Sequence, residues 1–464
     1  MATNNDIPVI KTFIYKNKYF VYDAYKNQIL ELSKEHFREV ELLLDYGTIK
    51  YQESNNSTKQ HKEVEQLIKK GYFRGAFIEK IQHPDTDFAG SIVDRCINDI
   101  TFQVTKNCNF LCRYCMYAAP NNIERDHENV NMPWSVAHKA IDFLLQHSCD
   151  AEILVVSFYG GEPLLNFNLI VNIVEYLERK IHTKRIIYNT TVNGSLLSNN
   201  VIDFLVKHNF RLAISLDGCE EIQNRHRKFK GDGSPTYDIV FNNILNLKNK
   251  YPEYFNTHVK FVPVGFKDEK FENVVNFFEV LGVPEERLIC LPADMEGIDY
   301  IESNIPETVN IDQKSVNTDK ENERIVDNKA LILLREIYNK KNIIPSQWHH
   351  NGPCIAGFKR LFVDASGKLF PCEKVLEREE FQIGDIYSGI NIDKVKELMN
   401  IGKITEKECK SCWALRFCSM CASSCNDIEE CSLTYTQKIN QCKIQKEKAL
   451  FFFKYLVDEM SKNG

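Results

Sequence analysis

The chain has 464 residues, of which 43% are hydrophobic and 26% charged, and its formal net charge is -6. This length predicts more than one domain, and the composition excludes wholesale disorder. The mild negative charge argues against a nucleic-acid or membrane-surface partner. Because neither a secretory signal nor a long apolar run occurs, we expect a cytoplasmic protein with no membrane partner.

Residues 1–85 are expected to form a small winged-helix-like module. Apolar and polar residues alternate over residues 11–33, as in strands, and helical spacing follows over 34–45 and 61–73. Residues 1–80 carry 13 Lys and Arg against 11 Asp and Glu, whereas a DNA-binding face should be basic. Peptide binding along a strand edge is therefore the favoured role.

From residue 95 to 300, strand-like runs alternate with helical patterns. The runs lie at residues 98–105, 151–160, 185–194, 210–218, 257–265 and 287–294. Apolar residues at helical spacing fill the intervals between the runs. This alternation predicts a parallel β/α fold, either a barrel or an open sheet. The active site of such a fold lies at the C-terminal ends of its strands.

Unusual residues follow these strands. Three cysteines spaced C-x3-C-x2-C come after the first strand, GGEP closes the second, NG closes the third and SLDG closes the fourth. Thiolates select zinc, copper(I) or iron–sulfur clusters, and a four-iron cluster ordinarily takes four cysteines. Three cysteines on one loop would leave one iron open for a reacting ligand. The sequence therefore favours a catalytic cluster held by Cys108, Cys112 and Cys115.

Residues 301–345 are expected to form a flexible insertion and a bridging helix. Residues 302–329 contain no aromatic side chain and many polar ones, a composition that is typical of surface insertions. Near the C-terminus, a helical pattern carries the stripe ALFFFKYLV. We expect this stripe to pack in the core rather than against a membrane.

Nine cysteines fall within the last 111 residues. In a cytoplasmic chain, this density indicates metal or cluster ligands rather than disulfides. A zinc-ribbon-like site is an alternative, but it would use only four of them: Cys409, Cys412, Cys418 and Cys421. Four further cysteines have no partner at a useful spacing and are expected to be small buried residues. They are Cys96, Cys149, Cys219 and Cys290.

The cysteine trio on the loop after the first strand resembles the radical SAM superfamily, whose core is a partial (β/α)6 TIM barrel. The resemblance implies a [4Fe–4S] cluster on Cys108, Cys112 and Cys115 that binds S-adenosyl-L-methionine through its open iron. In the family, one electron cleaves this cofactor to methionine and a 5'-deoxyadenosyl radical, which abstracts a substrate hydrogen. The residues implied to bind the cofactor are Tyr114, Gly160, Gly161, Glu162, Asn193, Ser215, Asp217 and Arg227.

These assignments carry different roles. Gly160, Gly161 and Glu162 match the motif for the methionine ammonium group. Ser215 and Asp217 match ribose contacts, with Asn193 as a further candidate. Arg227 matches the arginine on the cofactor carboxylate, and Tyr114 matches the aromatic position beside adenine.

Residues 346–464 resemble the SPASM extension of this superfamily, which implies two auxiliary [4Fe–4S] clusters. By that resemblance Cys409, Cys412, Cys418 and Cys442 hold the second cluster. Cys354 and Cys372 begin the first. After Cys418 the spacing departs from the family pattern, so its remaining ligands stay open among Cys421, Cys425 and Cys431, with the first two favoured.

Modules such as residues 1–85 resemble RiPP recognition elements, which hold the leader of a precursor peptide by strand addition. The whole chain thus resembles a SPASM-domain peptide maturase that forms Cys-to-carbon thioether cross-links, as in sactipeptide and ranthipeptide maturases. A reductant protein such as flavodoxin or ferredoxin would supply electrons. Three alternatives remain: a carbon–carbon cross-linking maturase, an oxidase resembling anaerobic sulfatase maturases, and a zinc-binding adaptor.

Overall fold

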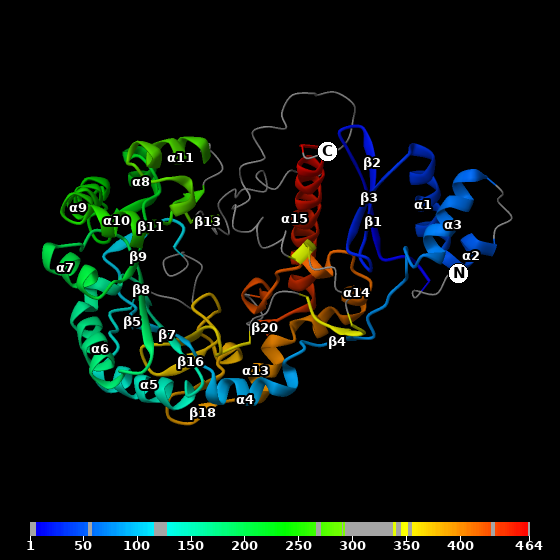
Figure 1. Cartoon of the computed structure of the whole chain (residues 1–464). Coiled ribbons are helices and arrows are strands. Elements are labelled where there is room, and N and C mark those ends of the chain that lie inside the picture. Colours follow the sequence, from blue (N-terminus) through cyan, green and yellow to red (C-terminus); the bar gives the residue numbers. More distant parts are fainter. Residues whose placement is uncertain are drawn as a thin grey trace. The chain divides into compact units, whose positions relative to one another are not determined.

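The structure is a computed structural model that divides into two compact units. The first unit comprises Met1–Asp87, Asn328–Cys354 and Lys396–Gly464, and the second comprises Phe88–Asp327 and Ile355–Val395. Figure 1 traces the chain through both units. The described residues are 6–53, 58–115, 128–265, 271–289, 291–292, 337–339, 345–350, 355–427 and 432–462. Most of the expected insertion, together with Cys290, Cys354 and Cys431, lies outside them.

The second unit is built on a nine-stranded sheet with the order β11-β9-β8-β7-β5-β15-β16-β17-β18. Five of its strands pair in parallel and follow one another in chain order. Such an order has no switch point of the kind found in doubly wound sheets, and it is typical of barrels. The predicted parallel α/β fold is confirmed. The strands are β5 (Asp99–Thr105), β7 (Ile153–Gly160), β8 (Arg185–Val192), β9 (Arg211–Ile214) and β11 (Val259–Phe261).

The sixth strand-like run continues the same succession in a shorter form. Leu288 forms a parallel bridge with Phe261. Just beyond them, β12 (Val264–Gly265) pairs in parallel with β13 (Leu291–Pro292). The sixth predicted run therefore lies beside the fifth, although its regular pairing is short.

Helices cover one side of this sheet, as Figure 1 shows. Each buries one apolar stripe: in α6 the residues at helical spacing from Leu169 to Leu177 are buried. The helices expected from the sequence are α5 (Trp134–His147), α6 (Phe167–Lys180), α7 (Asn199–Lys207), α9 (Tyr237–Lys250) and α11 (Phe271–Val280). The elements that were not expected include α8 (Glu220–His226), β10 (Arg227–Phe229) and α10 (Pro252–His258).

A meander extends the sheet beyond β5. Strand β15 (Leu361–Val363) pairs in parallel with β5. It is followed by the antiparallel strands β16 (Lys368–Phe370), β17 (Gly384–Asp385) and β18 (Gly389–Ile390). This stretch, which the sequence grouped with the C-terminal cysteines, thus pairs with the first strand of the parallel array. The expected domain boundaries stay predictions.

The N-terminal part of the first unit is a three-stranded antiparallel sheet followed by three helices. Lys16 and Asn17 have φ values of 47° and 59°, as a tight hairpin turn between two strands requires. Ser33 and Thr58 cap helices by accepting from the amides of His36 and His61. The elements are β1 (Ile10–Tyr15), β2 (Lys18–Asp23), β3 (Gln28–Leu32), α1 (Lys34–Tyr46), α2 (Thr48–Glu53) and α3 (Lys59–Lys69).

The central strand β2 is buried on both faces. Val21 belongs to a core cluster with Val40, Leu43 and Val64 of α1 and α3. On the opposite face, the ring of Tyr22 lies 4.3 Å from that of Phe453 in α15 (Tyr435–Lys462). The N-terminal sheet therefore shares its core with the C-terminal helix.

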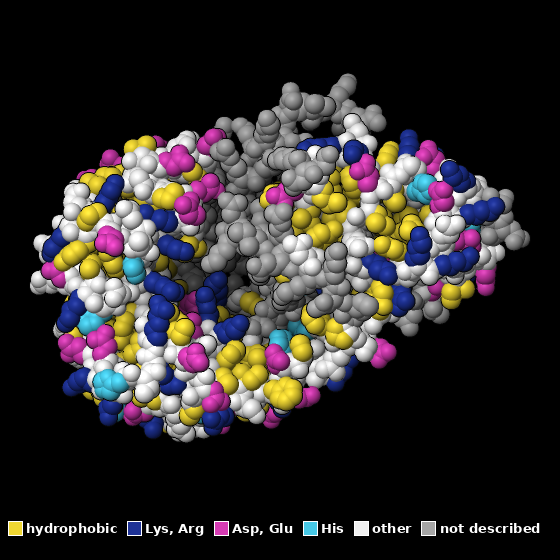
Figure 2. Space-filling view, in the orientation of Figure 1, with side chains coloured by type: hydrophobic (Ala, Val, Ile, Leu, Met, Phe, Trp, Pro, Cys, Tyr) yellow, Lys and Arg dark blue, Asp and Glu magenta, His cyan; other side chains and the backbone are white. Residues whose placement is uncertain are grey.

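The predicted burial of the ALFFFKYLV stripe is confirmed, because Phe452 and Phe453 are fully buried. None of the helices among the described residues combines the length and apolarity that a bilayer span requires. On the face shown in Figure 2, basic and acidic side chains are interspersed.

Candidate functional site

The three cysteines after β5 lie on a loop that is held by a second, short sheet. Strand β6 (Phe110–Cys112) pairs antiparallel with β10, and Cys112 stands opposite Arg227. Cys108 is buried, and its sulfur accepts from the amide of Phe110 at 3.4 Å. Cys115 donates its amide to the carbonyl of Cys112 at 3.0 Å. These backbone contacts therefore define the course of the loop from Cys108 to Cys115.

The donor set fits a cluster better than a single ion. The three thiols interact electrostatically with one another, yet no three His, Cys, Asp or Glu side chains of the described residues converge on one ion. A four-iron cluster binds several cysteines through different irons, so its ligands need not converge on one point. Burial raises the pKa of Cys112 to about 12 although Arg227 lowers it. Metal binding must therefore displace the thiol protons.

The two glycines of GGEP pack against the start of the cysteine loop. A Cβ on Gly160, whose φ is 138°, would lie 1.9 Å from the carbonyl oxygen of Thr105. A Cβ on Gly161 would lie 2.2 Å from that of Asn107. The amide of Glu162 also donates to Asn107 at 2.8 Å. Close approach between the two strand ends thus requires both glycines, and their contact with the cofactor stays a prediction.

Glu162 is a buried carboxylate that has no counter-ion among the described residues. It is 1% exposed and accepts from the amides of Asn193 at 2.7 Å and Leu164 at 3.1 Å. No cationic side chain of the described residues forms an ion pair with it. Burial raises its pKa to about 7, while the two amide bonds lower it. Such a carboxylate fits an ammonium ligand, which would supply the missing positive charge.

We expect Glu162→Gln to remove a pH dependence of stability. Without cofactor, the folded protein keeps the proton on Glu162 up to about pH 7, whereas the unfolded chain loses it near pH 4.5. Rising pH therefore costs the wild type about 3 kcal/mol of unfolding free energy across this window, and the glutamine variant is spared that loss. Unfolding midpoints of cofactor-free protein from pH 4 to 8 measure the difference. Glu221→Gln, at an exposed carboxylate, should leave the slope unchanged; parallel curves for wild type and Glu162→Gln would contradict the prediction.

Three predicted cofactor residues meet in one buried network. The guanidinium of Arg227 donates two hydrogen bonds, of 2.9 and 3.1 Å, to the carboxylate of Asp217. The hydroxyl of Tyr114 donates to the same carboxylate at 2.7 Å, and the guanidinium lies 5.2 Å from the Tyr114 ring centre. Asp217 is fully buried and also accepts from the amide of Val264 at 3.2 Å. This network ties the cysteine loop to the end of β9 and to β10.

A second polar network, which the sequence analysis did not predict, lies beside the cysteine loop. Asn193, at the end of β8, donates to Asn109 of the cysteine loop at 2.8 Å and accepts from Ser195 at 2.7 Å. Asn109 completes the triangle by donating to Ser195 at 2.9 Å. The position of Asn109 between Cys108 and Cys112 is the feature of the sequence that could have identified it as a site residue. Ser215 lies apart: its amide donates to the carbonyl of Val192, and its hydroxyl forms no hydrogen bond with the described residues.

Four cysteines of the first unit come together from separate elements. Cys409 lies in α14 (Glu406–Lys410), Cys412 and Cys418 flank η7 (Leu415–Phe417), and Cys442 lies in α15. Their thiols interact electrostatically. Burial raises the pKa of Cys412 to about 11 and that of Cys418 to about 12. These are the residues expected to hold the second auxiliary cluster, which stays a prediction.

The first auxiliary cluster is less completely described. Cys421 lies 3.0 Å from the hydroxyl of Ser423, and Cys425 is fully buried in electrostatic reach of Cys421. Cys372 belongs to the second unit. Because Cys354 and Cys431 lie outside the described residues, the ligand set stays a prediction.

The expectation that the unpaired cysteines are buried is wrong for two of them. Cys149 and Cys219 are exposed. Cys149 follows the C-terminal end of α5 and bonds to the carbonyl of Gln146, and Cys219 occupies the position just before α8. Both lie in turns at helix ends, where side chains reach the surface. Cys96 is partly exposed.

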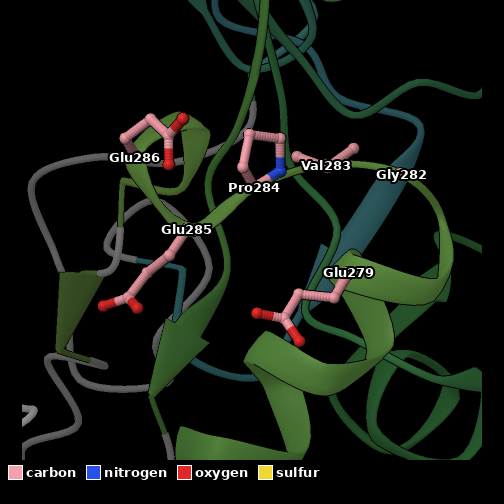
Figure 3. Close-up of a pocket in the computed structure, with 6 residues that line it drawn as sticks. All are labelled: Glu279, Gly282, Val283, Pro284, Glu285 and Glu286. Atoms are coloured by element: carbon pink, nitrogen blue, oxygen red, sulfur yellow. The ribbon is translucent and has the colours of Figure 1, made fainter.

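A pocket of about 510 Å³ opens beside the end of α11 (Figure 3). Glu279 and Glu285 extend toward the same side of it, whereas Glu286 points away from them. None of the predicted site residues lines it. Acidic side chains at a turn are solvated on their own, so the pocket defines no ligand.

Comparisons with known proteins agree with the geometry. Residues 102–281 match the model of the Radical SAM superfamily. The chain is 32% identical over 187 residues to uncharacterized protein MJ0907 of Methanocaldococcus jannaschii, an alignment that covers 37% of this chain and 61% of that protein. It is 23% identical over 383 residues to the radical SAM cyclopropyl synthase TigE of Paramaledivibacter caminithermalis, covering 78% and 77%.

Another relative is the cysteine-type anaerobic sulfatase-maturating enzyme of Clostridium perfringens, which is 25% identical over 374 residues in an alignment that covers 76% of this chain and 94% of that protein. The structure of native anSMEcpe with bound AdoMet superposes with a TM-score of 0.54 at 20% identity, covering 78% of this chain and 98% of the other. Residues 102–281 are therefore a radical SAM domain, and members of that superfamily use S-adenosylmethionine and a [4Fe–4S] cluster.

Proposed function

We propose that this protein modifies a ribosomally made precursor peptide by joining a cysteine sulfur to a carbon of another residue. The proposal that the substrate is a peptide rests on the N-terminal sheet. Among the described strands, β1 and β3 each pair only with β2, so each has one open edge. A free strand edge takes up an extended peptide through main-chain hydrogen bonds. Relatives named for sulfatase maturation act on a protein substrate, which supports the same class.

We assign the leader to the edge of β3. The amide of Ile29 donates to the hydroxyl of Tyr338 and so points away from β2. Because outward and inward amides alternate along a strand, the amide of Glu31 points outward as well. The Ile29 amide is already paired with Tyr338, so the outward amide of β3 that stays open among the described contacts is that of Glu31. The leader would add to β3 at this position, and the outward amides of β1 form the alternative edge.

The residues of the second unit would handle the cofactor. When bound, the cluster and S-adenosylmethionine supply a 5'-deoxyadenosyl radical. Cys108, Cys112 and Cys115 would hold the cluster, and Glu162 would receive the ammonium group. Asp217 and Arg227 form an ion pair with each other here. With the cofactor bound, the Asp217 carboxylate would contact the ribose and the Arg227 guanidinium would contact the carboxylate of S-adenosylmethionine.

The electron balance gives the C-terminal cysteines a role. A thioether replaces one C–H and one S–H bond by a C–S bond, so the peptide loses two hydrogens. One hydrogen atom leaves to the deoxyadenosyl radical. The other leaves as a thiol proton to solvent and one electron, and that electron needs an acceptor. An iron–sulfur cluster on the C-terminal cysteines would accept it.

The test is mass spectrometry of a Cys-containing precursor peptide after co-expression with this protein. We expect a loss of about two mass units per cross-link, one for each hydrogen removed, with no thiol left for iodoacetamide. Retained thiols would favour carbon–carbon linkage or oxidation. An unchanged peptide mass, with no deoxyadenosine formed by the reduced protein, would favour the zinc adaptor.

Glu31→Pro tests the docking edge. Proline removes the outward amide and leaves the β2–β3 ladder intact, so we expect leader binding to weaken at least about tenfold, the worth of one hydrogen bond. The matched control is Thr12→Pro: the same alternation places its amide outward on β1. Fluorescence anisotropy of a labelled leader measures both. Weaker binding only with Thr12→Pro would move the leader to β1, and unchanged binding with both would refute strand addition.

A further inference from the structure

A lysine is buried among the C-terminal cysteines. Lys438 of α15 is fully buried. Its Nζ donates to the hydroxyl of Thr405 at 2.5 Å and to the sulfur of Cys409 at 3.5 Å. It takes part in none of the ion pairs among the described residues. Among the described residues, the ammonium group thus has a hydroxyl and a thiol within hydrogen-bond distance, while the carboxylate of Glu408 interacts with it only electrostatically.

An ammonium group in this position needs negative charge nearby. Removing it from water is costly unless an anion compensates. Cys442 lies one helical turn after Lys438, on the same face of α15, and Lys438 also interacts electrostatically with Cys418 and Cys442. Thiolates that bind a metal cluster would supply that charge. A metal cluster on these cysteines would therefore account for the burial of a lysine among them.

We propose that Lys438 is a positioning residue for the cluster site formed by Cys409, Cys412, Cys418 and Cys442, and that it makes this site a better electron acceptor. A positive charge and a hydrogen bond at a ligand sulfur stabilise the reduced, more negative state. Burial strengthens both effects because the local dielectric constant is low. The inference rests on the proposed function, since it assumes that these cysteines hold a cluster.

The same helix carries a matched control. Lys446 also interacts electrostatically with Cys412 and Cys442, but its side chain is exposed. Water and salt screen an exposed charge. Lys446 therefore shares the sequence element and the charge of Lys438 and differs from it in burial.

The experiment is a redox titration followed by electron paramagnetic resonance, using anaerobically reconstituted full-length protein. A background with Cys108, Cys112 and Cys115 replaced by alanine removes the signal of the cluster expected on those cysteines. Among the remaining signals, the one that is lost in Cys409→Ser marks the site of Lys438. We expect Lys438→Met to lower the reduced-to-oxidised ratio about tenfold at a fixed potential, which is a shift of about 59 mV. Lys438→Arg and Lys446→Met should stay close to the parent.

Each outcome of the titration supports or overturns the proposed role of Lys438. Iron lost from Lys438→Met but kept in Lys438→Arg would also support the proposal, because a buried charge would then be needed to hold the site. An unchanged midpoint with full iron content, or equal shifts for Lys438→Met and Lys446→Met, would overturn it. A parent that binds no iron at these cysteines would instead refute the proposed function.

Discussion

Cys112→Ala is expected to abolish reductive cleavage of S-adenosylmethionine and to remove about four irons per chain, the content of one cluster. Cys112 lies in β6, is fixed opposite Arg227 by the pairing with β10, and has no neighbouring cysteine on the loop beyond the two other ligands. No spare thiol can therefore replace it. Iron analysis and deoxyadenosine formation under dithionite measure the two effects after anaerobic reconstitution.

Cys149→Ala and Cys219→Ala provide matched controls. Both cysteines are exposed residues of the same unit, so both variants should keep the parent iron content and cleavage rate. Full iron content in Cys112→Ala would show that the loop does not hold the cluster. Cleavage that persists without the iron would show that the radical arises elsewhere.

Asp217→Leu is expected to destabilise the second unit by about 3–5 kcal/mol, because it leaves the buried guanidinium of Arg227 unpaired. It also removes the acceptor of Tyr114 and of the Val264 amide. The double variant Asp217→Leu with Arg227→Met removes both charges, so it should recover part of the loss. Anaerobic denaturant unfolding, followed by a probe in the second unit, measures the series.

The exposed pair between Arg225 and Glu221 on α8 is the control for the buried pair. Glu221→Ala should cost no more than about 1 kcal/mol, as is usual for surface ion pairs. If Asp217→Leu cost as little as Glu221→Ala, or if the double variant were as unstable as the sum of the single ones, the buried network would not hold the cysteine loop.

The parallel array was predictable because its signals are local. Strand-like runs and helical stripes repeat at periods that the backbone itself imposes, and β5, β7, β8 and β9 lie where those runs predict them. The cysteine spacing and GGEP are also local, since each is a short run of residues that one loop requires. The C-terminal cysteines were recognisable by their density, although their spacing left the ligands of the first auxiliary cluster open.

Contacts between distant segments were not predictable. The pairing of β6 with β10, and of β15 with β5, joins short strands that carry no periodic pattern of their own. Cys149 and Cys219 were expected inside because cysteine is commonly buried, yet their places in turns expose them. Lys438 reads as an ordinary surface lysine on a helix until the fold encloses it.

Local signals in the sequence predicted the class of chemistry and the alternation of parallel strands with helices, because residue types and backbone periods are properties of short segments. The tertiary structure alone decided which side chains meet. It joined Tyr114 and Arg227 on Asp217, left Glu162 without a counter-ion in the part of the chain that the structure describes, and placed Lys438 beside Cys409. Those arrangements depend on burial and charge compensation between distant segments, which become defined only once the chain has packed.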